Sequence, residues 1–136
     1  MTERYLVDSC ILIYLADKTI PEKHTQALNW LEKSSKDRLA VSAQNIREFA
    51  NICLLKEIIP CKEIIDFIDS FSAKFEVLQD DFIDTKNAVS AIKNKKKLFW
   101  DASIVSVMKR NKIETILTEN SSDFNALGAK TINPLK

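Results

Sequence analysis

Glycine and histidine are almost absent from this chain of 136 residues, and each scarcity excludes a class of site. Gly128 is the only glycine, which excludes a P-loop and a dinucleotide-binding fingerprint, because both need several glycines close together. The only histidine, His24, lies in a polar stretch beside Lys23 and Thr25, so we interpret it as a surface residue. A zinc site built on histidines and histidine-dependent nucleophilic catalysis are therefore not expected.

Cysteine, net charge and long apolar runs are scarce as well. The three cysteines lack CxxC spacing, which argues against a disulfide scaffold or a zinc ribbon, and we assign them no function. No stretch approaches the roughly 20 apolar residues of a membrane span. Reduced cysteines and the absence of an apolar leader favour a cytoplasmic protein without membrane contact. With a net charge of +1, binding to nucleic acid would need a local basic patch.

Short apolar runs alternate with stretches of helical periodicity along the whole chain, which we interpret as one domain spanning residues 1–136. Strands are expected near residues 5–7, 39–41, 75–78 and 115–117, with a weaker one near 130–132. Between them, apolar residues recur at helical spacing, as at Ile46, Phe49 and Cys53. This alternation predicts an α/β fold: a parallel sheet of four to five short strands, flanked by helices on both faces.

Three carboxylates stand where such a sheet binds ligands, beyond the carboxyl ends of its strands. Asp8 follows the first strand, Glu48 lies about one turn into the helix after the second, and Asp101 begins a later helix. All three have apolar neighbours, and a buried carboxylate normally becomes neutral, forms an ion pair or binds a metal. Because carboxylate oxygens are hard ligands, the pattern favours Mg²⁺ or Mn²⁺.

Each of these acids also has a purely structural interpretation. Asp8 and Asp101 can cap the helices that they begin, and Glu48 can pair with Arg47 or another cation. For any one acid alone, the structural interpretation is the stronger. The coincidence of all three at one end of the sheet favours a metal site.

Four segments, in order, resemble the motifs of the PIN-domain nucleases and, among them, the VapC-like toxins of bacterial toxin–antitoxin pairs. No single motif is specific, but the ordered set runs over nearly the whole chain, from Tyr5 to Pro134. The segments are Tyr5-Leu6-Val7-Asp8-Ser9, Ser42-Ala43-Gln44-Asn45-Ile46-Arg47-Glu48-Phe49, Phe99-Trp100-Asp101-Ala102-Ser103-Ile104 and Ile116-Leu117-Thr118-Glu119-Asn120-Ser121-Ser122-Asp123-Phe124.

The resemblance implies a metal-dependent endoribonuclease that forms homodimers and is commonly inhibited by a small antitoxin protein. It also implies that Asp8, Glu48 and Asp101 hold Mg²⁺ or Mn²⁺. The chain departs from many relatives at Asn120, where they carry an aspartate directly after the fourth strand. Asn120 can offer a neutral carbonyl oxygen, and Asp123 is expected to compensate as an outer contributor of charge.

Polar and basic neighbours of these acids have two interpretations each. Ser9 and Thr118 either orient the carboxylates or make ordinary capping and strand-end hydrogen bonds. Arg47 either contacts RNA phosphates or neutralises an acid. The run Lys95, Lys96 and Lys97 just before Asp101 either guides RNA toward the acids or is a solvated helix end.

Two other functional classes compete with the nuclease. A receiver-like signalling domain would need an acidic pair after the first strand and a late lysine in the site, and Ser9-Cys10 fits this poorly. A PIN-fold interaction module without nuclease activity stays open because of Asn120.

Overall fold

The computed structural model describes residues 3–34 and 38–136, which form seven α-helices, one 3-10 turn and five strands. None of these helices is long and apolar enough to cross a membrane. In chain order the elements are β1 (Arg4–Val7), α1 (Ser9–Ala16), α2 (Pro21–Lys33), β2 (Arg38–Ser42), α3 (Ala43–Leu55), α4 (Cys61–Lys74), β3 (Glu76–Leu78), α5 (Phe82–Ile92), η1 (Lys96–Leu98), α6 (Phe99–Arg110), β4 (Thr115–Leu117), α7 (Ser121–Ala126) and β5 (Lys130–Ile132).

All five strands run parallel in one sheet, in the order β3-β2-β1-β4-β5. The chain moves outward from central β1 through β2 and β3, and then crosses back to place β4 on the other side of β1. Ligands of such sheets bind where the strand order reverses, which here is between β1 and β4. Val7 is in register with Leu117, so Asp8 and Thr118 emerge side by side beyond the two strand ends.

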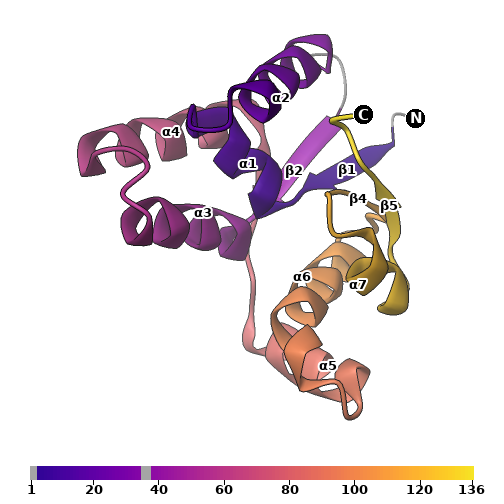
Figure 1. Cartoon of the computed structure of the whole chain (residues 1–136). Helices are drawn as coiled ribbons and strands as arrows, with labels where there is room; N and C mark the ends of the chain where they lie inside the picture. Colours follow the sequence, from indigo (N-terminus) through magenta and orange to yellow (C-terminus); the bar gives the residue numbers. More distant parts are fainter. Residues whose placement is uncertain (1–2, 35–37) are drawn as a thin grey trace.

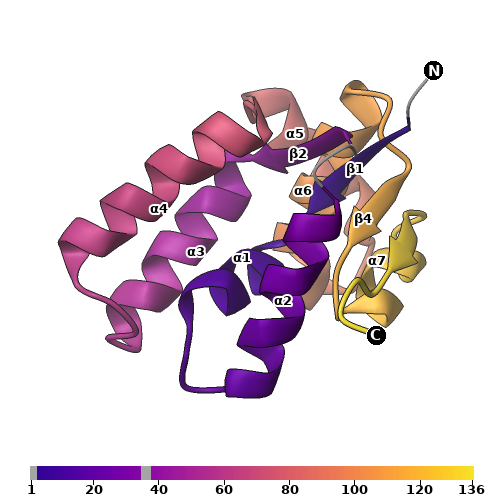
Figure 2. The same ribbon diagram turned by 90° about the horizontal axis from the view of Figure 1, so that it is seen from above.

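Helices cover both faces of the sheet, as the sequence predicts (Figure 1). On one face α1 to α4 enclose a core that includes Leu12, Phe49 and Phe71, and the last two rings meet edge-on with centroids 4.9 Å apart. On the other face α6 and α7 contribute Ile104 and Phe124 to a second core. The view from above also shows α3 and α4 lying alongside each other, away from α7 (Figure 2). The separate cores fix the helices that carry the polar residues at the sheet edge.

Short polar side chains cap two of the helices that carry or adjoin the site, α1 and α3. Asp8 has an extended backbone and caps α1 by accepting from the Ser9 amide. Ser42 caps α3 in a reciprocal capping box with Asn45. α6 begins at Phe99 rather than at Asp101, so Asp101 lies in the first turn and is not a cap. The capping interpretation therefore holds for Asp8 and is wrong for Asp101.

Candidate metal centre

Asp8 lies at the centre of the site, with only 7% of its surface exposed. Its Oδ1 accepts from the Ser9 amide at 2.9 Å, and its Oδ2 accepts from the Thr118 hydroxyl at 2.7 Å and from the more distant Cys10 thiol at 3.7 Å. Burial raises the pKa of Asp8 above its usual value, although all three hydrogen bonds oppose the rise. Ser9 and Thr118 thus orient this carboxylate, and Ser9 does so through its backbone amide.

Glu48 reaches the same edge of the sheet from α3, where its side chain is half-buried. Gln44, one turn earlier, donates from Nε2 to Glu48 Oε2 at 3.3 Å and to the backbone oxygen of Trp100 at 2.9 Å. Burial raises the pKa of Glu48, the Gln44 hydrogen bond lowers it, and the charge of Asp8 raises it. Sequence reasoning missed Gln44, although its i, i+4 spacing from Glu48 was an available signal.

Asp101 completes the group of acids from the first turn of α6. Burial raises the pKa of its carboxyl to about 7, and the negative charges of Asp8, Glu48 and Asp123 contribute to that rise. Together with Asp101, these three acids come from four different elements or their ends, so the fold brings together acids that lie far apart in the sequence. The sequence-derived expectation of convergence agrees with this electrostatic coupling.

Asn120 and Asp123 form the outer side of the group. The Asn120 side chain donates from Nδ2 to Asp101 Oδ2 at 3.3 Å and to Asp123 Oδ2 at 3.2 Å. Its amide nitrogen, rather than the expected carbonyl oxygen, therefore faces the acids, and an oxygen ligand from Asn120 would require the amide to turn over. The neighbouring Phe124 is fully buried, which holds the first turn of α7 and with it Asp123 at this edge.

The nearby cations are paired with other acids. Arg47 Nη2 lies 2.5 Å from Asp80 Oδ2, so the expected pairing of Glu48 with its neighbour Arg47 is not formed. Lys23 Nζ pairs with Glu119 Oε2 at 2.5 Å. Within residues 3–34 and 38–136, no ion pair reaches Asp8, Glu48, Asp101 or Asp123.

The chemistry of this group suits a hard divalent cation. Its carboxylates are buried or half-buried, repel one another and lack a pairing cation among the described residues. In the conformation described, however, no three His, Cys, Asp or Glu side chains of residues 3–34 and 38–136 are arranged to hold a metal ion. Asp8, Glu48 and Asp101 fit such an ion by ligand type, and binding would require their side chains to move closer together.

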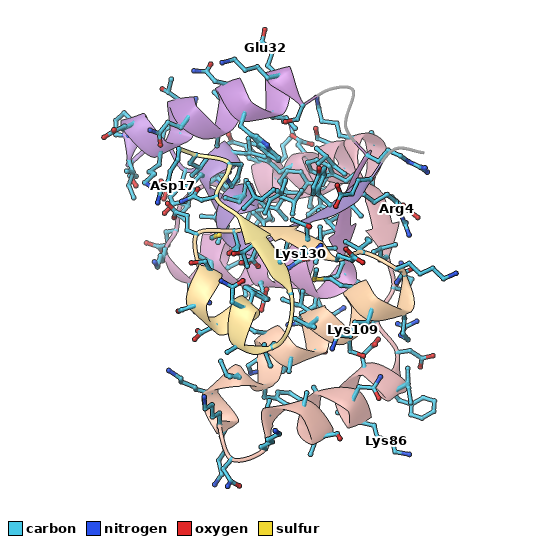
Figure 3. The ribbon with its side chains drawn as sticks, turned by 90° about the vertical axis from the view of Figure 1, so that its right-hand side faces the viewer. Arg4, Asp17, Glu32, Lys86, Lys109 and Lys130 are labelled. Carbon is cyan, nitrogen blue, oxygen red and sulfur yellow. The ribbon has the colours of Figure 1, made fainter. Side chains whose placement is uncertain are left out.

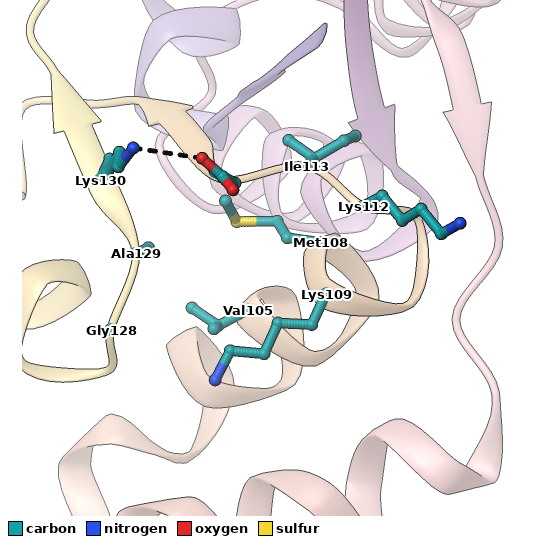
Figure 4. A pocket seen from close by; sticks show the side chains of 9 residues that line it. Val105, Met108, Lys109, Lys112, Ile113, Gly128, Ala129 and Lys130 are labelled. Atoms are coloured by element: carbon teal, nitrogen blue, oxygen red, sulfur yellow. Dashed lines mark hydrogen bonds and ion pairs between the residues drawn. The ribbon is translucent and has the colours of Figure 1, made fainter. Parts of the chain in front are cut away.

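A cavity of about 490 Å³ lies at the opposite edge of the sheet, by the amino ends of β4 and β5. Val105 and Met108 line it beside Lys109 and Lys130 (Figure 4), and Lys130 pairs with Glu114 at 3.2 Å. Lys109 and Lys130 also mark this side of the molecule in Figure 3. Because ligands of parallel sheets bind at the carboxyl ends of the strands, this cavity is distinct from the acidic site.

His24 also departs from its sequence interpretation. It is half-buried rather than a free surface residue, and its Nδ1 lies 2.9 Å from the backbone oxygen of Tyr14. The contact holds α2 against α1 and leaves His24 outside the group of acids. The exclusion of histidine chemistry from this site is therefore unaffected.

Comparison with known proteins gives a consistent assignment of the fold. The family model of the PIN domain matches residues 5–130. No curated protein sequence matches the chain significantly.

Solved structures with the same fold cover almost the full length. VapC20 of Mycobacterium tuberculosis, a toxin that cleaves the sarcin–ricin loop, is 17% identical with a TM-score of 0.73, over 92% of this chain and 95% of its own. FitAcB of Neisseria gonorrhoeae is 16% identical with a TM-score of 0.64, over 96% and 97%. VapBC2 of Rickettsia felis, solved with a fragment of its promoter DNA, is 15% identical with a TM-score of 0.67, over 95% and 97%. At these identities the likeness establishes the fold alone.

Proposed function

The chain belongs to the PIN-domain family, and from this premise we propose that it is a metal-dependent endoribonuclease that hydrolyses RNA phosphodiester bonds. The observation that carries the proposal is the convergence of Asp8, Glu48 and Asp101, without an ion pair among the described residues, at the point where the strand order reverses. A protein rarely retains a group of mutually repelling, desolvated carboxylates for stability, because each costs free energy unless a cation neutralises it.

The side chains of the site have separable roles in this proposal. Asp8, Glu48 and Asp101 would hold Mg²⁺ or Mn²⁺, which when bound supplies the positive charge that polarises a phosphate and lowers the pKa of water. Thr118 and the Ser9 amide hold the Asp8 carboxylate in one orientation. Gln44 does the same for Glu48 and fixes α3 to the start of α6. Asp123 contributes negative charge from outside these three ligands.

RNA would approach over the basic run Lys95, Lys96 and Lys97. These lysines are exposed, form no ion pair among the described residues and directly precede α6, which carries Asp101. Arg47 is less available for phosphate, because it is paired with Asp80.

We propose further that the protein is the toxin of a toxin–antitoxin pair, acts in the cytoplasm as a homodimer, and is inhibited by a small antitoxin. The support is the family, together with the fold shared with VapC20, which is itself a toxin that cleaves the sarcin–ricin loop. A short gene overlapping the start of this one would support the toxin role. An isolated gene whose expression does not slow growth would count against it.

The test of the nuclease proposal is cleavage of purified RNA with Mg²⁺ or Mn²⁺, against the same reaction in EDTA. We expect Asp8→Asn to abolish metal-dependent cleavage, whereas Asp66→Asn, a change at an exposed aspartate on α4, should leave cleavage like that of the wild type. RNA cleavage that persists in EDTA and in Asp8→Asn would refute the proposal.

A PIN-fold interaction module without catalysis is the second candidate, and one observation favours it. The Asn120 amide nitrogen already donates to oxygens of Asp101 and Asp123, which lowers their need for a metal. Under the nuclease proposal, Asn120→Asp should tighten metal binding and keep or raise cleavage. If neither the wild type nor Asn120→Asp cleaves RNA or binds metal, the module is the better description.

A further inference from the structure

An open hollow adjoins the acidic group on the side of α3. It has a volume of about 440 Å³ and is lined by five residues, Gln44, Arg47, Glu48, Asn51 and Trp100. The first four lie on one face of α3, and Trp100 comes from the first turn of α6. This volume is within the range of about 300–1,000 Å³ that small-molecule and nucleotide sites occupy. Since Glu48 belongs to both, a group bound in the hollow would lie directly beside the candidate metal centre.

Trp100 is unusually exposed for a large aromatic residue. Its large aromatic side chain is 64% exposed, although the seven residues after Asp101 on the same helix are buried. The Phe99 ring packs against the indole at a steep angle, with ring centroids 5.0 Å apart, and Gln44 donates a hydrogen bond to the backbone oxygen of Trp100. The indole is therefore supported by the Phe99 ring, and its backbone is fixed by Gln44, while much of its surface is open to a ligand. An exposed, supported aromatic ring is the kind of surface on which nucleobases stack.

The polar groups of the hollow favour a base over a phosphate. Glu48 brings negative charge, which repels phosphate but accepts hydrogen bonds from the amino groups of bases. Arg47, the cation in the lining, is paired with Asp80. Asn51 is exposed, and its side-chain amide makes no hydrogen bond to any residue that the structure describes, so both its donor and its acceptor are available to a base edge.

We propose that this hollow is a nucleobase subsite for single-stranded RNA, in which one base stacks on Trp100 and presents its edge to Asn51. A base in a duplex is already stacked and paired, so only a single-stranded or looped-out nucleotide can enter. The subsite would place the nucleotide next to the bond that is cut. The inference rests on the proposed nuclease function for its biological meaning, but its binding can be measured without catalysis.

Binding is measured with the Asp8→Asn protein in EDTA, so that the RNA stays intact. The probes are single-stranded oligoribonucleotides of about ten nucleotides, within the range that single-strand sites cover, and the matching duplexes. Adding Trp100→Ala should weaken single-strand binding about 5- to 150-fold, which corresponds to the usual loss of one stacking aromatic. Trp100→Phe should restore most of the affinity. Duplex binding should stay the same in all of these proteins.

Phe82→Ala is the matched control, because Phe82 is an aromatic residue on α5 that is 77% exposed and lies outside the hollow. It should bind single-stranded RNA like its parent. A second readout uses Trp30→Phe. The chain has two tryptophans, so this variant keeps Trp100 alone. Its fluorescence should be quenched by single-stranded RNA and not by the duplex. Thermal melting of each variant confirms that it is folded.

The outcomes separate this inference from the nuclease proposal. If the wild type cleaves RNA with metal but Trp100→Ala binds normally and Trp100 is not quenched, the subsite is wrong and the nuclease proposal stands. If Trp100-dependent binding is found but no metal supports cleavage, the subsite stands and the nuclease proposal is wrong. Equal loss of affinity in Trp100→Ala and Phe82→Ala would also overturn the subsite, because it would show a nonspecific effect of removing exposed aromatics.

Discussion

Asp84 and the acids at the sheet edge are buried carboxylates with opposite surroundings. At the α5–α6 contact, Asp84 is 1% exposed and accepts from Arg110 Nε at 2.8 Å, from Arg110 Nη2 at 2.6 Å and from the Ser106 hydroxyl at 2.7 Å. Burial alone would raise the pKa of Asp84, but the hydrogen bonds from Arg110 and Ser106 outweigh it and hold the pKa below its usual value.

At the sheet edge, burial raises the pKa of Asp8, Glu48 and Asp101, and no cation among the described residues pairs with them. The comparison teaches that burial of an acid is not itself the functional signal. Where a buried acid serves structure, the fold supplies donors that stabilise its charge, as Arg110 and Ser106 do at Asp84. At the sheet edge, where the acids have raised pKa values and no ion pair among the described residues, we infer that the compensating cation comes from outside the chain.

The largest effect should come from Asp101→Asn, measured as the rate of metal-dependent RNA cleavage. Losing a group that only orients a metal ligand often costs about 10- to 100-fold, so losing a ligand should cost at least that. The unfolding free energy of the metal-free protein should be unchanged or slightly higher, because one repelling charge is gone. If metal-free Asp101→Asn fails to fold, the residue is structural and the comparison breaks down.

Asp84→Asn should show the reverse pattern. It leaves the Arg110 guanidinium without its partner, and breaking a fully buried pair costs about 3–5 kcal/mol. Because the Arg110 side chain is about one-third exposed, we expect a smaller loss of about 2–3 kcal/mol in denaturant unfolding. RNA cleavage should be normal at temperatures where the variant is folded. Unchanged stability would remove the contrast between the two groups.

The pH dependence of stability should also differ between the two groups. Asp101 has a pKa of about 7 in the folded protein and near 3.9 when unfolded, so the folded state holds the proton more tightly. The metal-free protein should therefore lose stability as the pH rises from about 4 to about 7, and Asp101→Asn should reduce this loss. The pKa of Asp84 is lowered, so protonation of Asp84 should instead reduce the stability only as the pH falls below about 4.

Thermal melting between about pH 4 and pH 8 checks this, with and without Mg²⁺. Bound metal should reverse the loss of stability that occurs as the pH rises toward neutral, because the metal neutralises the deprotonated acids. The same dependence of melting temperature on pH in the wild type and in Asp101→Asn would contradict the raised pKa of Asp101.

The smallest effect should come from the lysine run. We expect the logarithm of RNA affinity to fall linearly with the logarithm of salt concentration. Changing Lys95, Lys96 and Lys97 together to glutamine should reduce the slope of this line by up to about 2, since each phosphate contact on a single strand contributes about 0.7. Lys62, Lys74 and Lys86, which are exposed on α4 and α5, provide the control triple. If both triples flatten the slope equally, the run is an ordinary solvated surface.

Much of the fold was predictable, because apolar runs that end in a polar residue mark buried strands. Asp8 and Thr118 could be placed at the ligand-binding edge from their positions after Val7 and Leu117 alone. The order of the four motifs also points to the family, and the match of the family model to residues 5–130 confirms it.

The partners of charged groups were much harder to predict, because they depend on contacts between distant segments. Arg47 pairs with Asp80, 33 residues away, instead of with its neighbour Glu48. Lys23 reaches Glu119 across 96 residues and so keeps that acid out of the group. The orientation of the Asn120 amide likewise follows from Asp101 and Asp123 together. Patterns in the sequence identify which acids converge, and only the three-dimensional contacts show which of them lack a partner.

Calorimetric titration of Mn²⁺ into the RNA-free protein tests most directly whether the unpaired acids form a metal site. We expect one bound ion in the wild type and in Asp84→Asn, and no tight binding in Asp101→Asn. A second ion should bind only when RNA phosphates are present, because Asn120 supplies no charge. Equal Mn²⁺ binding by the wild type and Asp101→Asn, or no binding by either, would contradict the central claim.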